Sequence, residues 1–357
     1  AQCLVGSEMC IRDSGCTPAK AELVWQDAMN LVTDIKYNAD SNGGNISFKV
    51  DRSSIRQGNA VIAIKDVSDA ILWSWHVWVT DEDINNVIEI TNHQNVKYNF
   101  MPVNLGQCDG NTITYEERSC KVKFIAGDQS KEITIKQLAN VIATGSNAPF
   151  YQWGRKDPLY PSNGMGNTTK IWYDKEGIPS TANPMKGTFS AGNDCIKNCI
   201  LNPNLMHNRY NGDYTYYNLW SADNKTTSAN DNPVNKTIYD PCPVGFKLPA
   251  SNAFTGFTTT GESVSSSTQV NGTWSSSEKG WYFYTNSEKT QSIFFPALGY
   301  RSYSTMRPGS IGTQGCFWSA HPVAKGNNYY LRTSSVDVQP TYMVDRGFGY
   351  ALRPCQD

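Results

Sequence analysis

The strongest signal along the chain is a run in which apolar and other residues alternate, as in a half-buried β-strand. In residues 71–79 every odd position is apolar, so a period of two places these side chains on one core face. They are Ile71, Trp73, Trp75, Val77 and Val79. His76 lies on the opposite face, where we expect a packed strand residue. The polar stretch 66–70 can join this strand to the apolar run 61–64 as a hairpin, which predicts a small antiparallel β-sandwich.

A change in composition divides the chain in two. Residues 81–95 are polar enough to be a linker, and a second set of strands begins near Val96. The length supports the division, because 357 residues exceed the ~100 to 200 of an ordinary domain. We therefore predict two units, 15–95 and 96–357.

The second unit is predicted to be rich in loops. Residues 121–136 contain two alternating strands, whereas 155–235 is loop-like apart from one short candidate helix at 194–206. The final third of the chain returns to short strands. The predicted fold class is therefore α+β, mainly β, with a small antiparallel β-sandwich followed by a loop-rich domain.

The first residues fit neither unit. Glu8, Arg12 and Asp13 interrupt the apolar stretch that a secretory signal requires. The string from Cys3 to Ser14 resembles translated sequencing-adapter read-through. We therefore interpret residues 1–14 as a non-native leader that packs against nothing essential, and we expect the native export signal to be missing.

The net charge and the cysteine content indicate the cellular compartment and the classes of partner. Lys and Arg number 31 and Asp and Glu 32, so the formal charge of -1 provides no field for nucleic acid or an anionic membrane. No run of 18 apolar residues occurs, so no spanning helix is predicted. Only 18% of residues are charged, and ten cysteines are dispersed along the chain, which is typical of disulfide-forming extracellular proteins. We expect an extracellular protein at the cell surface or outer membrane.

The spacing of two cysteines suggests one disulfide. Cys108 and Cys120 would close a loop of about a dozen residues beside the strands, which in the chain-entropy model stabilises the fold by roughly 3 kcal/mol. We favour that pair.

Another group of residues leaves two interpretations open. Cys195, Cys199 and His207 offer three soft ligands, and zinc would need a fourth. In an oxidising compartment disulfides are the favoured use of such cysteines, so no metal is predicted. The pairing of Cys16 and Cys316, like that of Cys195 and Cys199, stays open.

Several longer motifs occur in a fixed order: Asn59–Asp66, Ile71–Asp81, Tyr151–Pro158, Tyr239–Pro249, Pro296–Arg301 and Gly347–Pro354. Together they resemble the C-terminal part of Bacteroidetes fimbrillin-family surface proteins that end in a Fibrobacter-succinogenes-type major paralogous domain. The similarity covers nearly everything after residue 20. It implies an exported cell-envelope protein whose last domain, 96–357, is similar to C-type-lectin-like folds and to the formylglycine-generating-enzyme fold, with its two ends brought together.

The resemblance also implies one disulfide. Family members carry a cysteine in the Asp-Pro-Cys-Pro motif and often another near the C-terminus, which correspond to Cys242 and Cys355. Their bond would fasten the closing strand to the domain.

Catalytic motifs are not found in the sequence. No Gly-x-Ser-x-Gly turn occurs, the four histidines leave few general bases, and the active-site cysteine pair of formylglycine-generating enzymes cannot be placed. The motifs of calcium-dependent lectins are only imperfectly matched. We therefore predict no enzyme, no cofactor and no metal.

Ligand binding is predicted near the C-terminus. Sugar rings pack their C–H faces on Tyr or Trp, while their hydroxyls bind amides and guanidinium groups. Such side chains gather in the predicted ligand-binding residues Asn327, Asn328, Tyr329, Tyr330, Arg332, Tyr342 and Arg346. The alternative for each is a core position in a strand. A second cluster with the same ambiguity consists of Tyr210, Tyr214, Tyr216 and Tyr217.

These observations favour an adhesin: a pilus-associated cell-surface module that binds a glycan or a host or microbial surface protein without catalysis, with pilin subunits as further candidate partners. The alternative is a structural or assembly component of the cell envelope with no ligand of its own. A third hypothesis is an enzyme of the formylglycine-generating fold, which would need a catalytic set that the sequence does not supply.

Overall fold

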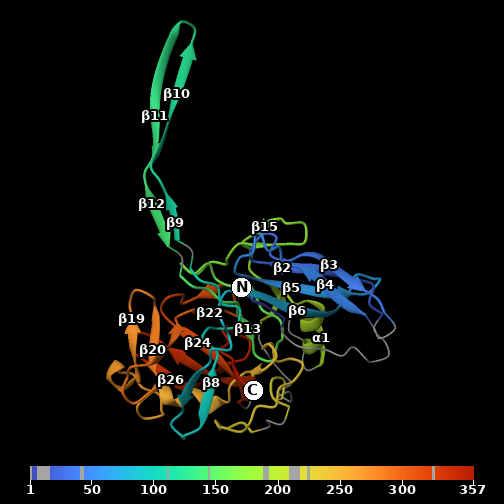
Figure 1. Cartoon of the computed structure of the whole chain (residues 1–357), viewed down its shortest axis with the longest axis vertical. Coiled ribbons are helices and arrows are strands. Elements are labelled where there is room, and N and C mark those ends of the chain that lie inside the picture. The colour runs from blue at the N-terminus through green and yellow to red at the C-terminus, as the bar shows by residue number, and fades with distance from the viewer. Residues whose placement is uncertain are drawn as a thin grey trace.

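The computed structural model describes residues 2–5, 17–40, 44–110, 112–143, 145–187, 193–208, 218–222, 226–323 and 326–357. Its secondary structure is mainly β, which confirms the predicted α+β, mainly β class. The helices of this part of the chain are short: α1 (Asn193–Leu201) and the 3₁₀ helices η1 (Ser251–Phe257) and η2 (Ser267–Gln269). Figure 1 shows a body of β-sheets and loops from which one long hairpin projects.

The N-terminal unit is built on a six-stranded sheet. In spatial order its strands are β1 (Gln2–Val5), β6 (Ile71–Thr80), β5 (Gly58–Lys65), β2 (Lys20–Gln26), β14 (Trp172–Tyr173) and β15 (Pro179–Ser180). The hairpin of β3 (Thr33–Asn38) and β4 (Asn45–Lys49) packs its apolar side chains against this sheet. The unit is therefore a sandwich of open sheets, and it recruits β14 and β15 from far along the chain.

The residues interpreted as a leader that packs against nothing essential include one described strand, β1. Gln2–Val5 pairs antiparallel with β6 along its full length. Ladder hydrogen bonds come from the backbone, so an extended segment can cover an open sheet edge whatever its side-chain pattern.

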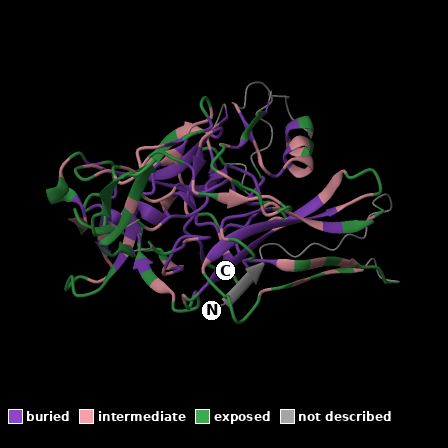
Figure 2. Ribbon diagram, turned by 90° about the horizontal axis from the view of Figure 1, so that it is seen from above, coloured by how far each residue is buried: buried purple, intermediate pink, exposed green. Residues whose placement is uncertain are grey.

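Strand β6 is buried on both faces. Trp75, Val77 and Val79 pack into the sandwich core, as their alternation predicts. On the other face, His76 is buried and Trp78 joins the core of the C-terminal unit. The two units therefore share a continuous interior, and the middle of the body holds most of the buried residues (Figure 2).

The predicted boundary at residue 95 falls inside a hairpin. Strand β7 (Ile88–Thr91) pairs with β8 (Lys97–Phe100), and the polar residues 92–95 form the turn between them. The amide of Asn92 donates to the carbonyl of Val96 at 2.8 Å, and Asn95 has a φ of 63°. These residues are polar because they make a tight turn. Since β7 and β8 belong to one sheet with β28 (Cys355–Gln356) and β18 (Phe246–Lys247), the C-terminal unit begins before β7.

The two ends of the C-terminal unit meet, as predicted. Strand β28 (Cys355–Gln356) lies between β8 and β18 (Phe246–Lys247) in one sheet. The buried Arg353 guanidinium donates to the carbonyls of Pro102 and Phe294, each at 2.7 Å. These contacts fasten the closing segment to the body.

Neither predicted disulfide is formed, because all four cysteines are free thiols. Cys108 is buried at the base of the projecting hairpin, whereas Cys120 is exposed within it, so extended chain separates them. Cys242 and Cys355 are both buried as free thiols, and Cys355 lies on β28.

The rest of the body is made of small sheets. A four-stranded sheet contains, in spatial order, β13 (Tyr151–Gln152), β27 (Gly349–Tyr350), β22 (Tyr300–Arg301) and β23 (Pro308–Gly309). The first three-stranded sheet contains β19 (Gly272–Ser275), β20 (Gly280–Tyr284) and β21 (Ser292–Pro296), and the second contains β24 (Gly315–Pro322), β25 (Asn327–Thr333) and β26 (Val338–Asp345). Strands β16 (Met185–Gly187) and β17 (Leu205–His207) form a parallel pair. A phenylalanine-rich core fills the space between the three-stranded sheets and η1.

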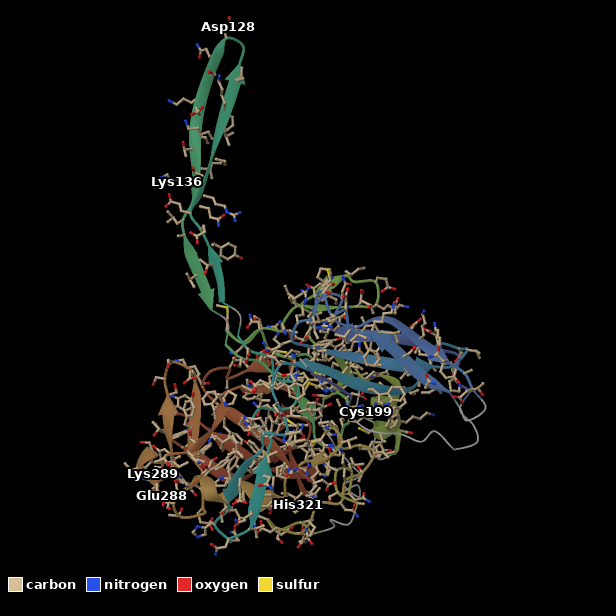
Figure 3. All side chains as sticks on the ribbon, in the orientation of Figure 1. Asp128, Lys136, Cys199, Glu288, Lys289 and His321 are labelled. Carbon is tan, nitrogen blue, oxygen red and sulfur yellow. The ribbon has the colours of Figure 1, made fainter. Side chains whose placement is uncertain are left out.

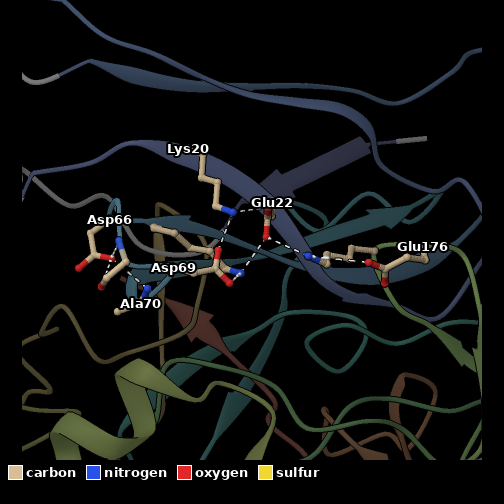
Figure 4. A network of polar contacts seen from close by, with 9 residues as sticks. Lys20, Glu22, Asp66, Asp69, Ala70 and Glu176 are labelled. Carbon is tan, nitrogen blue, oxygen red and sulfur yellow. Dashed lines mark hydrogen bonds and ion pairs between the residues drawn. The ribbon is translucent and has the colours of Figure 1, made fainter.

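Polar contacts hold the predicted 66–70 turn in place (Figure 4). The Asp66 carboxylate accepts hydrogen bonds from the amides of Ser68 and Ala70 at 2.8 and 3.0 Å. The ammonium of Lys65 bridges Glu22 at 2.7 Å and Asp69 at 3.3 Å, which ties the turn to β2. Hydrogen bonding to Lys65 lowers the pKa of Glu22.

Candidate functional site

The predicted ligand-binding residues lie on strands, with one of them just beyond. Asn327 to Arg332 belong to β25 and Tyr342 to β26, while Arg346 follows β26 directly. Tyr330 and Tyr342 face each other across the antiparallel ladder. The structure therefore brings these residues together in one sheet.

Most of these residues are core. Asn328, Tyr329, Tyr330 and Arg346 are at most 8% exposed. The ring of Tyr330 packs against the rings of Trp318 and Tyr350, with centroids 5.8 and 4.6 Å apart. Ligand binding by these four side chains is therefore not supported, and the alternative of a core position in a strand is the correct one for them. Strand β25 is the middle strand of its sheet and is covered on both faces, so an alternating pattern cannot leave one face free.

The remaining predicted residues offer little binding surface. Tyr342 is 46% exposed, while Asn327 and Arg332 are half-buried. The Arg332 guanidinium is held by Asp337 and Gln339, each at 3.1 Å. The second predicted tyrosine cluster, at positions 210 to 217, lies outside the described residues.

A serine and a histidine meet in the C-terminal unit. The Ser251 hydroxyl lies 3.2 Å from Nδ1 of His321, and both side chains are completely buried. Burial lowers the pKa of His321 to about 4. A substrate could not reach this hydroxyl without opening the core, so the pair joins η1 to β24 and does not supply a nucleophile. Figure 3 labels His321 within the body.

The projecting hairpin is the most distinctive surface of the molecule, and we call residues 112–143 the arm. Its outer ladder pairs β10 (Arg118–Ala126) with β11 (Gln129–Gln137), and its inner ladder pairs β9 (Thr112–Tyr115) with β12 (Asn140–Ala143). The backbones of Cys108 and Asn147 pair at its base. In Figure 3, Asp128 marks the tip of the arm and Lys136 lies further down.

The outer ladder has one apolar and one polar face. Because directly paired residues share a face of a sheet, the register places the apolar side chains together. They are Cys120, Val122, Phe124, Ile133 and Ile135, and Lys131 lies opposite Phe124 at the end of the same face. The other face carries Lys121 and Glu132, which form an ion pair at 2.9 Å, together with Lys123, Thr134 and the exposed Ile125.

Nothing in the described part of the chain covers the arm. From 114 to 141 every residue except Val122 is exposed, including Phe124 at 57% and Ile135 at 52%. Both outer strands belong to a sheet of only two strands, so each leaves one edge unpaired among the described residues. Exposed apolar patches and open strand edges mark sites of protein association.

Sequence reasoning found the strands of the arm but missed the arm itself. The alternation at 121–136 predicts two strands, and that prediction is confirmed; the register then gives them one mainly apolar face. The sequence does not show whether another segment packs on the apolar face of these strands. The charge pattern of β10 was a usable signal, because Lys121 and Lys123 alternate with the apolar residues there and lie on the other face.

Comparison with protein-family models, with curated proteins and with solved structures gave no match. Within the described residues, no helix combines the length and apolar character that a bilayer crossing requires. Function is therefore inferred from the geometry of the molecule itself.

Proposed function

We propose that the chain is a non-catalytic cell-surface module that attaches to another protein subunit through the arm. The observation that carries this proposal is the exposed apolar face of the arm with its open strand edges. A two-stranded ribbon in water is at best marginally stable by itself, so a partner surface would complete its burial. The motifs that resemble fimbrillin-family surface proteins support an exported setting.

The partner we favour is the arm of a second copy. Residues 112–143 contain five basic and four acidic side chains, so two copies would repel each other little. A two-fold arrangement would bring apolar face onto apolar face, as in a packed pair of sheets about 10 Å apart. The Lys121–Glu132 face would then remain in water.

Recognition of a protein is favoured over recognition of a glycan. The aromatic and amide side chains that would hold a sugar ring are largely buried in β25. The arm, in contrast, exposes aliphatic side chains, which suit a protein surface better than a hydroxyl-rich ligand. This favours an assembly role for the adhesin-like module.

Light scattering coupled to gel filtration tests the proposal on the full chain. At about 50 µM we expect a dimer. Ile135→Asp should shift the dissociation constant at least tenfold toward monomer, because it places a charge in the apolar face. The matched control is Thr134→Asp, which puts the same charge on the neighbouring residue of the polar face and should leave the dimer intact.

Both variants change exposed side chains, so folding should be unaffected, and circular dichroism checks this. A monomeric wild-type chain at that concentration would overturn assembly through a second copy. Equal effects of Ile135→Asp and Thr134→Asp would show that the apolar face is not the contact.

A further inference from the structure

Two cysteines and a histidine form a buried cluster beside helix α1. Cys195, Cys199 and His207 each offer one ligand atom, and these three atoms all lie within 4.8 Å of one another. All three residues are at least nine-tenths buried. Figure 3 shows Cys199 on the helix, at the side of the body away from the arm.

The local fold brings these residues together from two elements. Cys195 and Cys199 are one turn apart in α1, so they lie on the same helix face. After the helix the chain reverses through a turn in which the Leu205 amide donates to the Asn202 carbonyl at 3.0 Å. Strand β17 then carries His207 back to the two sulfur atoms.

A glycine permits this close approach. Gly187 of β16 lies opposite His207 in the parallel pair. A Cβ atom at Gly187 would come 2.3 Å from Cδ2 of Leu205 and 3.3 Å from Nδ1 of His207. A larger residue at this position would therefore force the Leu205 side chain, and to a smaller extent the His207 imidazole, to shift.

The strand that carries the histidine is held from the body. Arg155 donates from Nη2 to the Pro203 carbonyl at 3.0 Å and from Nη1 to the Leu205 carbonyl. Gln152 hydrogen-bonds the backbone of His207 itself. These buried contacts preset the position of the imidazole, which lowers the cost of assembling a binding site.

We propose that Cys195, Cys199 and His207 bind one zinc ion. Two cysteine sulfurs and an imidazole nitrogen are the donors that zinc prefers in proteins, and two thiolates would balance its charge. Zn–S bonds of about 2.3 Å and Zn–N bonds of about 2.0 Å require donors roughly 3.5 to 3.8 Å apart in a tetrahedral site. Ligand atoms within 4.8 Å of one another need only a small contraction to reach that geometry.

The space beside Cys199 has room for one water molecule. A cavity of about 20 Å³ borders Cys199, together with Arg155, Asp157 and Tyr239. One water needs at least about 10 to 15 Å³ of such space. A zinc ion bound here would cross-link α1 to β17 and so stabilise a loop-rich part of the unit.

A disulfide between Cys195 and Cys199 is the competing use of the sulfurs. It would not explain why a third donor is held beside them by Gln152 and Arg155. The disulfide and the metal exclude each other, so one measurement separates them.

The test uses the full chain, purified under reducing conditions, stripped with a chelator and then given zinc chloride. After dialysis, elemental analysis should find one zinc per chain, and zinc should raise the melting temperature. Cobalt chloride, used as a probe in place of zinc, should give the absorption of a thiolate-bound ion. Cys199→Ser and His207→Ala should weaken zinc binding at least tenfold.

The matched control is Cys316→Ser, which changes another buried cysteine outside the cluster and should still bind one zinc. The stripped and reloaded wild-type chain keeps the proposal testable if a variant fails to fold. Failure of the reduced wild-type chain to retain zinc would overturn the proposal. So would a Cys195–Cys199 disulfide in peptide maps of protein isolated without reductant.

Discussion

The side chain of Gln152 hydrogen-bonds both backbone groups of His207. Its Nε2 donates to the carbonyl oxygen at 2.8 Å, and its Oε1 accepts from the amide nitrogen at 3.0 Å. The same Nε2 also donates to the carbonyl of Gly347 at 2.6 Å. The side-chain amide of Gln152 therefore replaces a neighbouring strand at His207 of β17. It also joins β17 to the closing segment of the chain through Gly347.

Replacing Gln152 with alanine should destabilise the protein by about 2 to 5 kcal/mol. The change leaves buried backbone donors and acceptors without partners, at roughly 1 to 3 kcal/mol each. Urea denaturation measures the free energy of unfolding. Gln291→Ala, at an exposed glutamine, is the control and should change it by less than about 0.5 kcal/mol. Equal stabilities of the two variants would contradict the role given to Gln152.

Stability should fall as the pH is lowered from 6.5 toward 4. Burial lowers the pKa of His76 to about 3, and its ring nitrogens lie 2.9 Å from Oδ1 of Asn59 and 3.0 Å from the Tyr151 hydroxyl. Burial also lowers the pKa of His321 to about 4. Because both folded-state values are below the unfolded value of about 6.5, the unfolded chain takes up protons first as the pH falls. Stability is thus present above pH 6.5 and is lost below it.

Each of these histidines should contribute a slope of about 1.4 kcal/mol per pH unit within that window. Unfolding in urea at a series of pH values measures the slope. His76→Gln should reduce it relative to the wild-type chain. A wild-type slope in His76→Gln would show that this imidazole is not buried in its neutral form.

Truncation of two paired tyrosines should have very different effects. Tyr330→Ala should cost about 3 to 5 kcal/mol, because it removes a buried ring that packs on Trp318 and Tyr350. Tyr342→Ala should cost about 1 kcal/mol or less, since that ring is 46% exposed. Melting temperatures of both variants measure the difference. Similar losses of stability in the two variants would contradict the burial of β25 on both faces.

Arg353→Lys should destabilise the closing segment by about 2 to 4 kcal/mol. The Arg353 guanidinium donates to Asn104 Oδ1 at 2.7 Å and to the carbonyls of Pro102 and Phe294. One ammonium cannot reach all three, so buried acceptors would lose their partners. Chemical unfolding is the measurement, with the exposed Arg307→Lys as control. Wild-type stability in Arg353→Lys would show that strand pairing alone closes the unit.

The sequence by itself determined the local structure and much of the core. Alternation identified the strand at 71–79 and the turn at 66–70, because a period of two assigns side chains to faces whatever surrounds them. Alternation also identified the strands of the arm. The mainly β class followed from the same local signals.

Only the tertiary structure decided which faces are covered. A strand pattern shows which residues share a face, but the partner of that face comes from distant segments. The strands of the arm alternate apolar and polar residues, and β25 is rich in aromatic residues, so both sequences predict strands. The arm nevertheless projects into solvent, whereas β25 is the middle strand of a sheet that is covered on both faces. For the same reason spacing could not pair the cysteines: contacts between Gln152, Arg155 and β17 gather Cys195, Cys199 and His207, whereas extended chain separates Cys108 from Cys120.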